Sequence, residues 1–270
     1  MRASMPHPLG LITLLTDFGD RDYFVASMKG VILTINPHTT LVDISHHVPP
    51  HSVEDAAYLL KSCYRYFPEG TVHVAVVDPG VGSARRPLVV KTARYYFLGP
   101  DNGLFSYIFD EEDEVEVREI ENQQYRLESV GYTFDGRDLF APSAAWLTKG
   151  KPASSFGRVI DDPITLPIVE PSRQGNRLVG RIEYVDRFGN LISNLTPHHI
   201  REFQSCAGRQ EIILQIGGHT LEGLVASYSE GLSDTPAALM NSSGKVEVFM
   251  NGKSAARHLR IGVGAEIHLC

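Results

Sequence analysis

Short apolar runs alternate with helical stripes over residues 11–77, and this alternation is the strongest constraint on the fold. A short apolar or β-branched run bounded by turn residues predicts a buried strand, and apolar side chains three and four residues apart predict one face of a helix. The predicted strands are 11–15, 40–44 and 71–77, and the predicted helices between them are 24–35 and 53–63. This order predicts an α/β fold, in which helices flank a mostly parallel sheet.

The carboxyl ends of the predicted strands should carry the functional residues. Right-handed crossovers bring these ends to one edge of a parallel sheet, and ligands bind beyond that edge. The segments that follow the three strands are 16–19, 45–47 and 78–82. We therefore expect these three segments to build a ligand site.

The sequence changes character after residue 160. Segment 161–176 is rich in proline and glycine, which is typical of a linker. The strand-like runs beyond it, separated by Gly-rich turns, are 178–185, 211–216, 245–249 and 265–269. We predict an α/β N-terminal domain over 1–167, a linker over 168–176 and an all-β, barrel-like C-terminal domain over 177–270.

Composition and charge exclude several classes of protein. The net charge is -7 and the pI about 5.9, so the chain lacks the positive charge that nucleic-acid binding requires. No apolar run approaches the roughly 18 residues of a membrane helix, and residues 1–10 do not resemble a signal peptide. Cys63, Cys206 and Cys270 are scattered and odd in number, which is typical of free thiols. We expect a cytoplasmic protein that binds neither nucleic acid nor membrane.

Acidic residues stand directly behind two predicted strands. Asp17 follows the first strand, where a carboxylate can accept the hydroxyls of a ribose. Asp20 and Asp22 are as well suited to capping the next helix as to a role in the site. Asp78 follows the third strand and opens a Gly-rich turn that lacks the lysine of a phosphate loop. Because Arg85 lies just beyond the same turn, Asp78 and Arg85 can converge on a small polar molecule.

Two further segments allow both a structural and a functional interpretation. Segment 132–138 precedes an apolar helical run, so Asp138 either caps that helix or belongs to a further loop at the same edge. Segment 186–190 suits a plain hairpin turn. It also suits a purine, with stacking by Phe188 and hydrogen bonds from Asn190. The residue pattern leaves both interpretations open.

Histidines after the second predicted strand raise the question of a metal site. Adjacent histidines diverge and the HExxH spacing is absent from the sequence, so we expect no metal and no cofactor. A site of Asp17, Asp43 and His46 is the weaker interpretation. The alternative of a metal-dependent hydrolase uses Asp17, Asp20, Asp22 and His46.

The order and spacing of these segments resemble the S-adenosylmethionine (SAM) hydroxide adenosyltransferases, or SAM hydrolases, which are homologous to the bacterial fluorinase and chlorinase. The resemblance extends from about Leu11 to the C-terminus. Each motif alone is unspecific, but together they are specific. The motifs are 16–19, 47–50, 67–71, 77–82 with 85–87, 99–104, 133–138 and 186–190.

The resemblance implies a homotrimer that converts SAM and water to adenosine and L-methionine without a cofactor. The active site then lies where the N-terminal domain of one subunit meets the C-terminal domain of its neighbour. Asp17 would bind the ribose, Phe188 and Asn190 the adenine, and Asp186 and Ser242 the methionine end. The implied catalytic residues are Asp78, Arg85 and Asp135, and the implied substrate-binding residues are Asp17, Phe18, His51, Phe134, Gly136, Asp186, Phe188, Asn190 and Ser242.

The chain departs from the family pattern at two places. Many members have His where this chain has Asp135, and Ser242 and Ser243 stand where the halogenases have an arginine that binds methionine. A catalytically impaired SAM- or adenosine-binding protein is therefore an alternative. A halogenase is a weaker alternative, because Asp78 would repel a halide and the extra halogenase loop has no room between Lys91 and Gly99.

Overall fold

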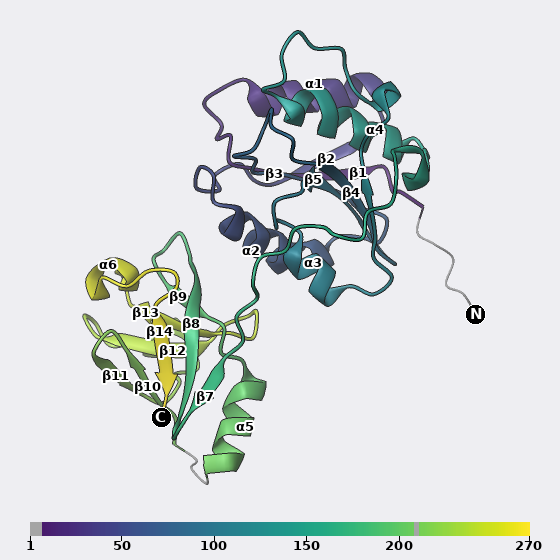
Figure 1. Ribbon diagram of the computed structural model, residues 1–270. Coiled ribbons are helices and arrows are strands. Elements are labelled where there is room, and N and C mark those ends of the chain that lie inside the picture. The colour runs from purple at the N-terminus through teal and green to yellow at the C-terminus, as the bar shows by residue number, and fades with distance from the viewer. Residues whose placement is uncertain (1–6, 208–210) are drawn as a thin grey trace. The chain divides into compact units, whose positions relative to one another are not determined.

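The computed structural model describes residues 7–207 and 211–270, and the chain divides into two units between Ile168 and Val169 (Figure 1). The first unit contains a six-stranded sheet in the order β2-β1-β3-β5-β4-β6. Its first four strands run parallel, while β4 is antiparallel to both of its neighbours. The strands are β1 (Leu11–Thr16), β2 (Thr40–Ser45), β3 (Val72–Val76), β4 (Pro87–Lys91), β5 (Tyr96–Pro100) and β6 (Glu116–Glu119).

Helices cover both faces of this sheet, with α1 and α4 on one side and α2 and α3 on the other (Figure 1). Successive strand residues alternate between the two cores: Val74 and Val76 pack toward one, Ala75 and Val77 toward the other. Burial on both faces explains why β3 is apolar at every position except His73. The helices are α1 (Phe24–Ile35), α2 (Val53–Cys63), α3 (Ser106–Glu111) and α4 (Ala141–Thr148), with short helical turns at η1 (Tyr64–Tyr66), η2 (Gln123–Tyr125), η3 (Gly136–Phe140) and η4 (Ala153–Ser155).

The predicted α/β class is confirmed, and the predicted elements of residues 11–77 are present as β1, α1, β2, α2 and β3. The sequence pattern missed β5 and β6. Residues 92–95 connect β4 directly to β5, and Thr92 Oγ1 accepts hydrogen bonds from the backbone N–H groups of Arg94 (3.2 Å) and Tyr95 (3.0 Å). This tight turn leaves no insertion after β4.

The second unit is an antiparallel, barrel-like sheet in the order β11-β10-β14-β8-β9-β13-β12 (Figure 1). A bridge between Val225 and Leu239 joins the segment after β11 to β12, so that the sheet nearly closes. The elements are β7 (Ser172–Gln174), β8 (Arg177–Val185), β9 (Leu191–Ser193), α5 (Pro197–Ala207), β10 (Ile213–Ile216), β11 (His219–Glu222), η5 (Tyr228–Glu230), β12 (Pro236–Met240), β13 (Val246–Met250), α6 (Ala255–Leu259) and β14 (Glu266–Leu269).

Several elements of this unit were not predicted, among them the strands β9, β11 and β12. Residues 172–174, which fall in the predicted linker, form β7 and pair with β8, because Gly175 adopts a φ of 61° and turns the chain back. Helices α5 and α6 were also missed; of the α5 side chains whose burial is described, only Ile200 and Phe203 join the buried core. No helix of the described ranges 7–207 and 211–270 is long and apolar enough to cross a membrane.

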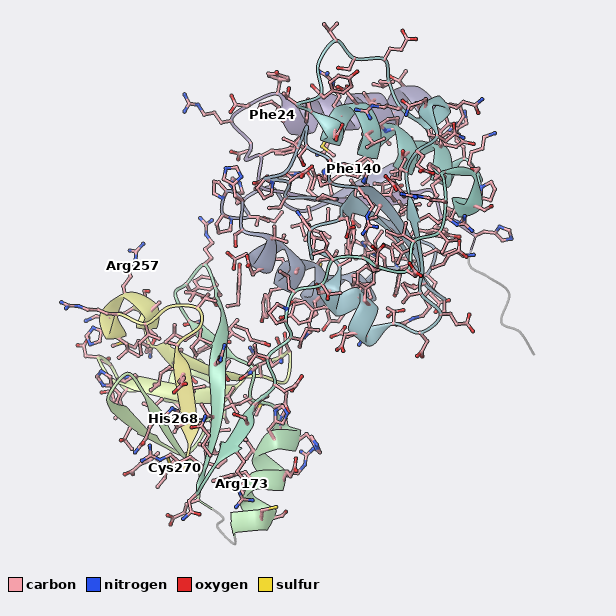
Figure 2. All side chains as sticks on the ribbon, in the orientation of Figure 1. Phe24, Phe140, Arg173, Arg257, His268 and Cys270 are labelled. Carbon is pink, nitrogen blue, oxygen red and sulfur yellow. The ribbon has the colours of Figure 1, made fainter. Side chains whose placement is uncertain are left out.

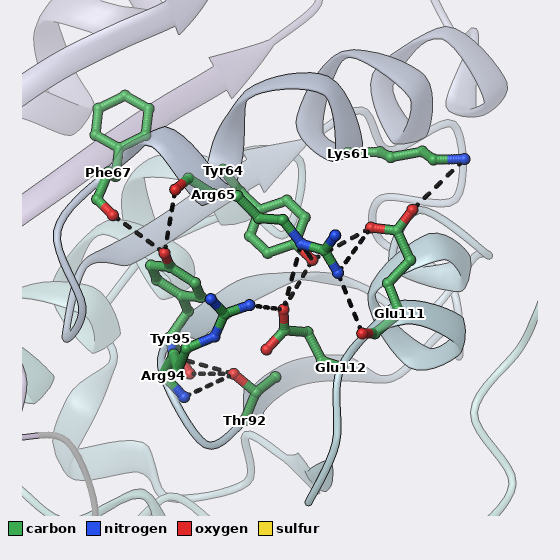
Figure 3. A network of polar contacts seen from close by, with 9 residues as sticks. All are labelled: Lys61, Tyr64, Arg65, Phe67, Thr92, Arg94, Tyr95, Glu111 and Glu112. Carbon is green, nitrogen blue, oxygen red and sulfur yellow. Dashed lines mark hydrogen bonds and ion pairs between the residues drawn. The ribbon is translucent and has the colours of Figure 1, made fainter. Parts of the chain in front are cut away.

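A buried carboxylate links three elements of the first unit. The Glu112 side chain is 2% exposed and accepts hydrogen bonds from the Arg94 guanidinium (2.6 Å) and the Tyr64 hydroxyl (2.9 Å) (Figure 3). Burial and the bond to Glu112 raise the pKa of Tyr64. The Arg65 Nη2 donates to the carbonyl of Glu111 (3.1 Å), so η1, the β4–β5 turn and the end of α3 are held together.

A buried histidine makes the stability of this unit depend on pH. His73 is fully buried, its Nδ1 hydrogen-bonds with Thr13 Oγ1 (2.8 Å), and its ring stacks on Phe97. Burial lowers the pKa of His73 to about 3, while in the unfolded chain a histidine titrates near 6.5. The unfolded state therefore binds the extra proton between these values, and the unfolding free energy should fall by about 1.4 kcal/mol for each pH unit below 6.5.

Denaturant unfolding at several pH values checks this expectation. His73→Phe should flatten the slope between pH 6.5 and pH 3, the limits set by the lowered pKa. The matched control His198→Gln removes a histidine with a 76% exposed side chain and should leave the slope unchanged. Identical slopes for the wild type and His73→Phe would contradict the assignment.

Candidate active site

Two carboxylates share one guanidinium beyond the carboxyl end of β3. Arg85 donates from Nε to Asp78 Oδ2 (2.9 Å) and from Nη2 to the same oxygen (2.5 Å). The same Nη2 donates to Asp135 Oδ2 (2.6 Å), and Asp135 lies directly before η3. The structure thus brings together the three residues for which the family resemblance implies catalysis.

This cluster is largely shielded from solvent. The exposed fractions of the side chains are 5% for Asp78, 11% for Arg85 and 10% for Asp135. Burial alone lowers the pKa of Arg85, but the hydrogen bond and charge of Asp78 and the charge of Asp135 raise it above its ordinary value. Arg85 is therefore always cationic, and it separates two carboxylates that would otherwise repel each other.

Arg126 is a fourth member of the cluster that the sequence analysis missed. Its Nη2 donates to Asp135 Oδ1 (2.9 Å), so the two oxygens of Asp135 each face a different guanidinium. Arg126 directly follows η2 and belongs to none of the motifs. Nothing in its sequence neighbourhood signals this contact.

An aromatic wall stands beside the carboxylates. The rings of Phe18, Phe24 and Phe134 lie with centroids 5.1 to 5.8 Å apart. With Asp78 and Asp135 they line a cavity of about 120 Å³. A Cβ at Gly136 would lie 3.2 Å from Phe18 and 3.1 Å from Phe134, so glycine permits this close packing.

Phe140 forms the inner boundary of this region. It is fully buried in the core between the sheet and helices α1 and α4 (Figure 2). The Arg85 guanidinium lies 5.5 Å from the centre of the Phe140 ring. An apolar residue therefore limits access of water to Arg85 from the inside.

The segment that follows β1 is held by the segment that follows β2. Asp17 Oδ2 accepts a hydrogen bond from the backbone N–H of His51 (2.9 Å), and His51 has a φ of 68°. The carbonyl of His46 accepts from Gly19 N–H (2.7 Å), and His46 Nδ1 hydrogen-bonds with Thr16 Oγ1 (2.9 Å). These contacts fix the backbone on both sides of Asp17.

The residues weighed as metal ligands do not form a group of three around one point. His46 Nε2 lies 3.1 Å from Asp43, and Lys29 lies 2.5 Å from the other oxygen of Asp43. Burial raises the pKa of Asp43, but Lys29 and His46 lower it overall. Across the described part of the chain, no group of three or more His, Cys, Asp and Glu side chains is placed to hold a metal ion.

The second unit has its own cavity, of about 560 Å³. The Asp186 carboxylate accepts hydrogen bonds from the backbone N–H groups of Phe188 (2.9 Å) and Asn190 (2.8 Å) and from Asn190 Nδ2 (3.0 Å). The segment is therefore a turn, and its side chains also line the cavity. The lining residues are Asp186, Phe188, Asn190, Tyr228, Phe249, Met250, Asn251, Gly252, Lys253 and Ser254.

Several of these lining residues were missed, and one implied residue lies elsewhere. Asn251, Lys253 and Ser254 follow β13, and only the position of this turn after an apolar strand hinted at them. Burial and a bond to Glu247 raise the pKa of Tyr228 to about 12. Ser242 is exposed in the turn before β13 and does not line the cavity.

Comparison with known proteins identifies the family of this chain. Residues 12–157 match the SAM hydroxide adenosyltransferase N-terminal domain, and residues 180–268 match the C-terminal domain. The (R)-S-adenosyl-L-methionine hydrolase of Thermus thermophilus is 34% identical over 265 residues, which are 96% of this chain and 98% of that protein. The chain belongs to the SAM hydroxide adenosyltransferase family, which confirms the resemblance.

A solved structure and a halogenating relative extend the comparison. The crystal structure of an uncharacterized conserved protein from Thermotoga maritima superposes with a TM-score of 0.87 at 31% identity, over 96% of this chain and 99% of that one. The fluorinase of an Actinoplanes species is 26% identical over 286 residues, which are 95% of this chain and 96% of that protein.

Proposed function

We propose that the protein hydrolyses S-adenosyl-L-methionine to adenosine and L-methionine. The observation that carries this proposal is the shielded cluster of Asp78, Arg85 and Asp135 beside an apolar wall. The name of the Thermus thermophilus relative supports SAM as the substrate and the (R) sulfonium epimer as the form to test first.

The sulfonium group of SAM activates C5′, because a neutral thioether is a good leaving group. Water oxygen forms a bond to C5′ as the C5′–S bond breaks, and the bonding electron pair goes to sulfur. The protein has to align the water with this bond, and such positioning contributes about 7–11 kcal/mol in favourable cases. No covalent intermediate is required.

Asp78 and Arg85 orient and polarise the attacking water. A carboxylate is a weak base for water, so the proton passes late, through Asp78 to solvent, as positive charge disappears from sulfur. A halide would be repelled by Asp78, which favours water over halide as the nucleophile.

The remaining site residues bind the substrate in this proposal. Asp17, fixed by the backbone of His51, accepts the ribose hydroxyls, and Phe18, Phe134 and Gly136 shape the apolar wall. In the second unit Phe188 and Asn190 take the adenine, and Asp186 lies nearby for the methionine ammonium.

We also propose the homotrimer, with the two kinds of cavity brought together between subunits. Each unit exposes aromatic rings at or near its cavity, with exposed fractions of 64% for Tyr23, 69% for Tyr132 and 77% for Phe188. Exposed aromatic rings are typical of interfaces. Light scattering of the purified protein measures the oligomeric state.

Free Cys63, Cys206 and Cys270 support a reducing, cytoplasmic location.

Incubation with SAM in ¹⁸O-labelled water tests the function. The two sulfonium epimers are supplied separately, and adenosine is analysed by chromatography and mass spectrometry. Label in the 5′-hydroxyl establishes that water attacks C5′. Tight SAM binding without product identifies a binding protein, loss of activity with a chelator identifies a metal-dependent hydrolase, and a 5′-halogenated adenosine in halide buffer identifies a halogenase.

A further inference from the structure

We infer that Arg126 is a positioning residue of this site, which holds Asp135 so that Arg85 remains aligned with Asp78. The effect on turnover rests on the proposed function. The contact itself is a feature of the first unit alone.

Arg126 and Arg85 hydrogen-bond to different oxygens of Asp135. Arg126 Nη2 donates to Oδ1 (2.9 Å), and Arg85 Nη2 donates to Oδ2 (2.6 Å). A carboxylate bound on one oxygen can rotate or shift, whereas one held on both oxygens cannot without losing a charge-assisted hydrogen bond. Arg126 therefore fixes the position of Asp135.

The charges of the cluster balance only when Arg126 is included. Asp78 and Asp135 are 5% and 10% exposed, and Arg85 alone would leave one shielded negative charge uncompensated. A shielded charge without a partner is strongly unfavourable. Arg126, itself 22% exposed, supplies the second positive charge.

The fold holds Arg126 in this place. The backbone N–H of the next residue, Leu127, donates to the carbonyl of Asp138 (2.8 Å), which joins this segment to η3. The guanidinium of Arg126 lies 5.7 Å from the centre of the Tyr132 ring. Arg126 is thus anchored by its backbone on one side and packed against an aromatic ring on the other.

If Arg126 were removed, Asp78 and Asp135 would compete for the guanidinium of Arg85. Asp78 and Asp135 already contact the same atom, Arg85 Nη2, at 2.5 Å and 2.6 Å. Without Arg126, Arg85 is the one side-chain partner that Asp135 keeps among the described residues, and Asp135 draws it away from Asp78. Because a displacement of about 1 Å can cost a hundredfold in rate, the water that Asp78 orients would be misaligned.

A double-mutant cycle tests this role. Arg126→Met should lower kcat about thirtyfold with KM for SAM changed by less than about twofold, since substrate binding groups are untouched. In an Asp135→Asn background the same change should lower kcat by only about twofold, because the charge that Arg126 holds is gone. Arg126→Lys keeps the charge and should recover part of kcat.

The control is Arg158→Met, which removes an arginine with a 65% exposed side chain from the same unit and should leave kcat unchanged. An unchanged kcat in Arg126→Met, or an equal loss with and without Asp135→Asn, overturns the inference. If Arg126→Met does not fold, the cycle is made with Arg126→Lys.

A wild type that releases no adenosine from either epimer overturns the proposed function instead. The coupling between Arg126 and Asp135 is then measured from the denaturant midpoints of the same four proteins. Additive shifts of these midpoints overturn the inference, and non-additive shifts support it.

Discussion

Asp78→Asn should lower kcat about a thousandfold while the Kd for SAM changes by less than about threefold, because removing one preorganised electrostatic group typically costs this much. Asn is neutral and carries an NH2 group in place of one oxygen, so it loses the charge that holds Arg85 and cannot accept from the guanidinium on both of its terminal atoms. The attacking water would lose its acceptor and the guanidinium its alignment. Single-turnover kinetics measures the chemical step, and calorimetric titration measures Kd.

The matched control is Asp20→Asn, the same chemical change at an 80% exposed side chain near His47. We expect its kcat to stay within about twofold of the wild type, as for most surface substitutions. This control also examines the metal-dependent alternative, which assigns Asp20 a ligand role. A turnover number unaffected by Asp78→Asn would refute the assigned mechanism.

Gly189→Ala should lower the unfolding free energy of the second unit by about 3 kcal/mol, from backbone strain plus overpacking. Gly189 has a φ of 85°, and a Cβ there would lie 2.0 Å from Ser254 Oγ and 2.5 Å from Ser254 Cβ. Gly189 O also accepts a hydrogen bond from Ala256 N–H (2.9 Å), so the turn cannot easily move away from α6. Since the turn carries Phe188 and Asn190, affinity for SAM should fall about tenfold or more.

Gly218→Ala separates strain from collision. Gly218 has a φ of 82°, but a Cβ there meets nothing within 4 Å. Backbone strain alone should therefore lower the unfolding free energy of this control variant, by about 1 kcal/mol, and the variant should bind SAM normally. Chemical denaturation and calorimetric titration compare the two variants. Equal destabilisation would show that the contact with Ser254 does not matter.

Local patterns predicted the first half of the fold well. Neighbouring residues alone are enough to predict a strand buried on both faces, such as β3, or a helix with one apolar face, such as α1. Strands β5 and β6 were missed because their pairing with neighbouring strands, not their own short runs, makes them part of the sheet. Helix α5 was missed for a similar reason, since its buried face is narrow.

The candidate site was predicted in part. Asp78 and Arg85 stand at the ends of one loop, so chain geometry alone brings them near each other. Asp135 was identified through the family resemblance, as a departure whose consequence was open. Arg126 belongs to no motif, and only the packing of its segment against η3 brings it to Asp135.

The sequence by itself determined the α/β class, the edge of the sheet that carries the loops and the family. These depend on periodicity, on the handedness of parallel connections and on motif order. All three can be derived from the order of residues along the chain, without knowing which distant residues come into contact. Only the tertiary structure decided that two carboxylates share Arg85 and that a second arginine balances them. Charge compensation depends on distances between side chains that lie far apart in the chain. Because a buried charge is poorly solvated, it needs an opposite charge close by.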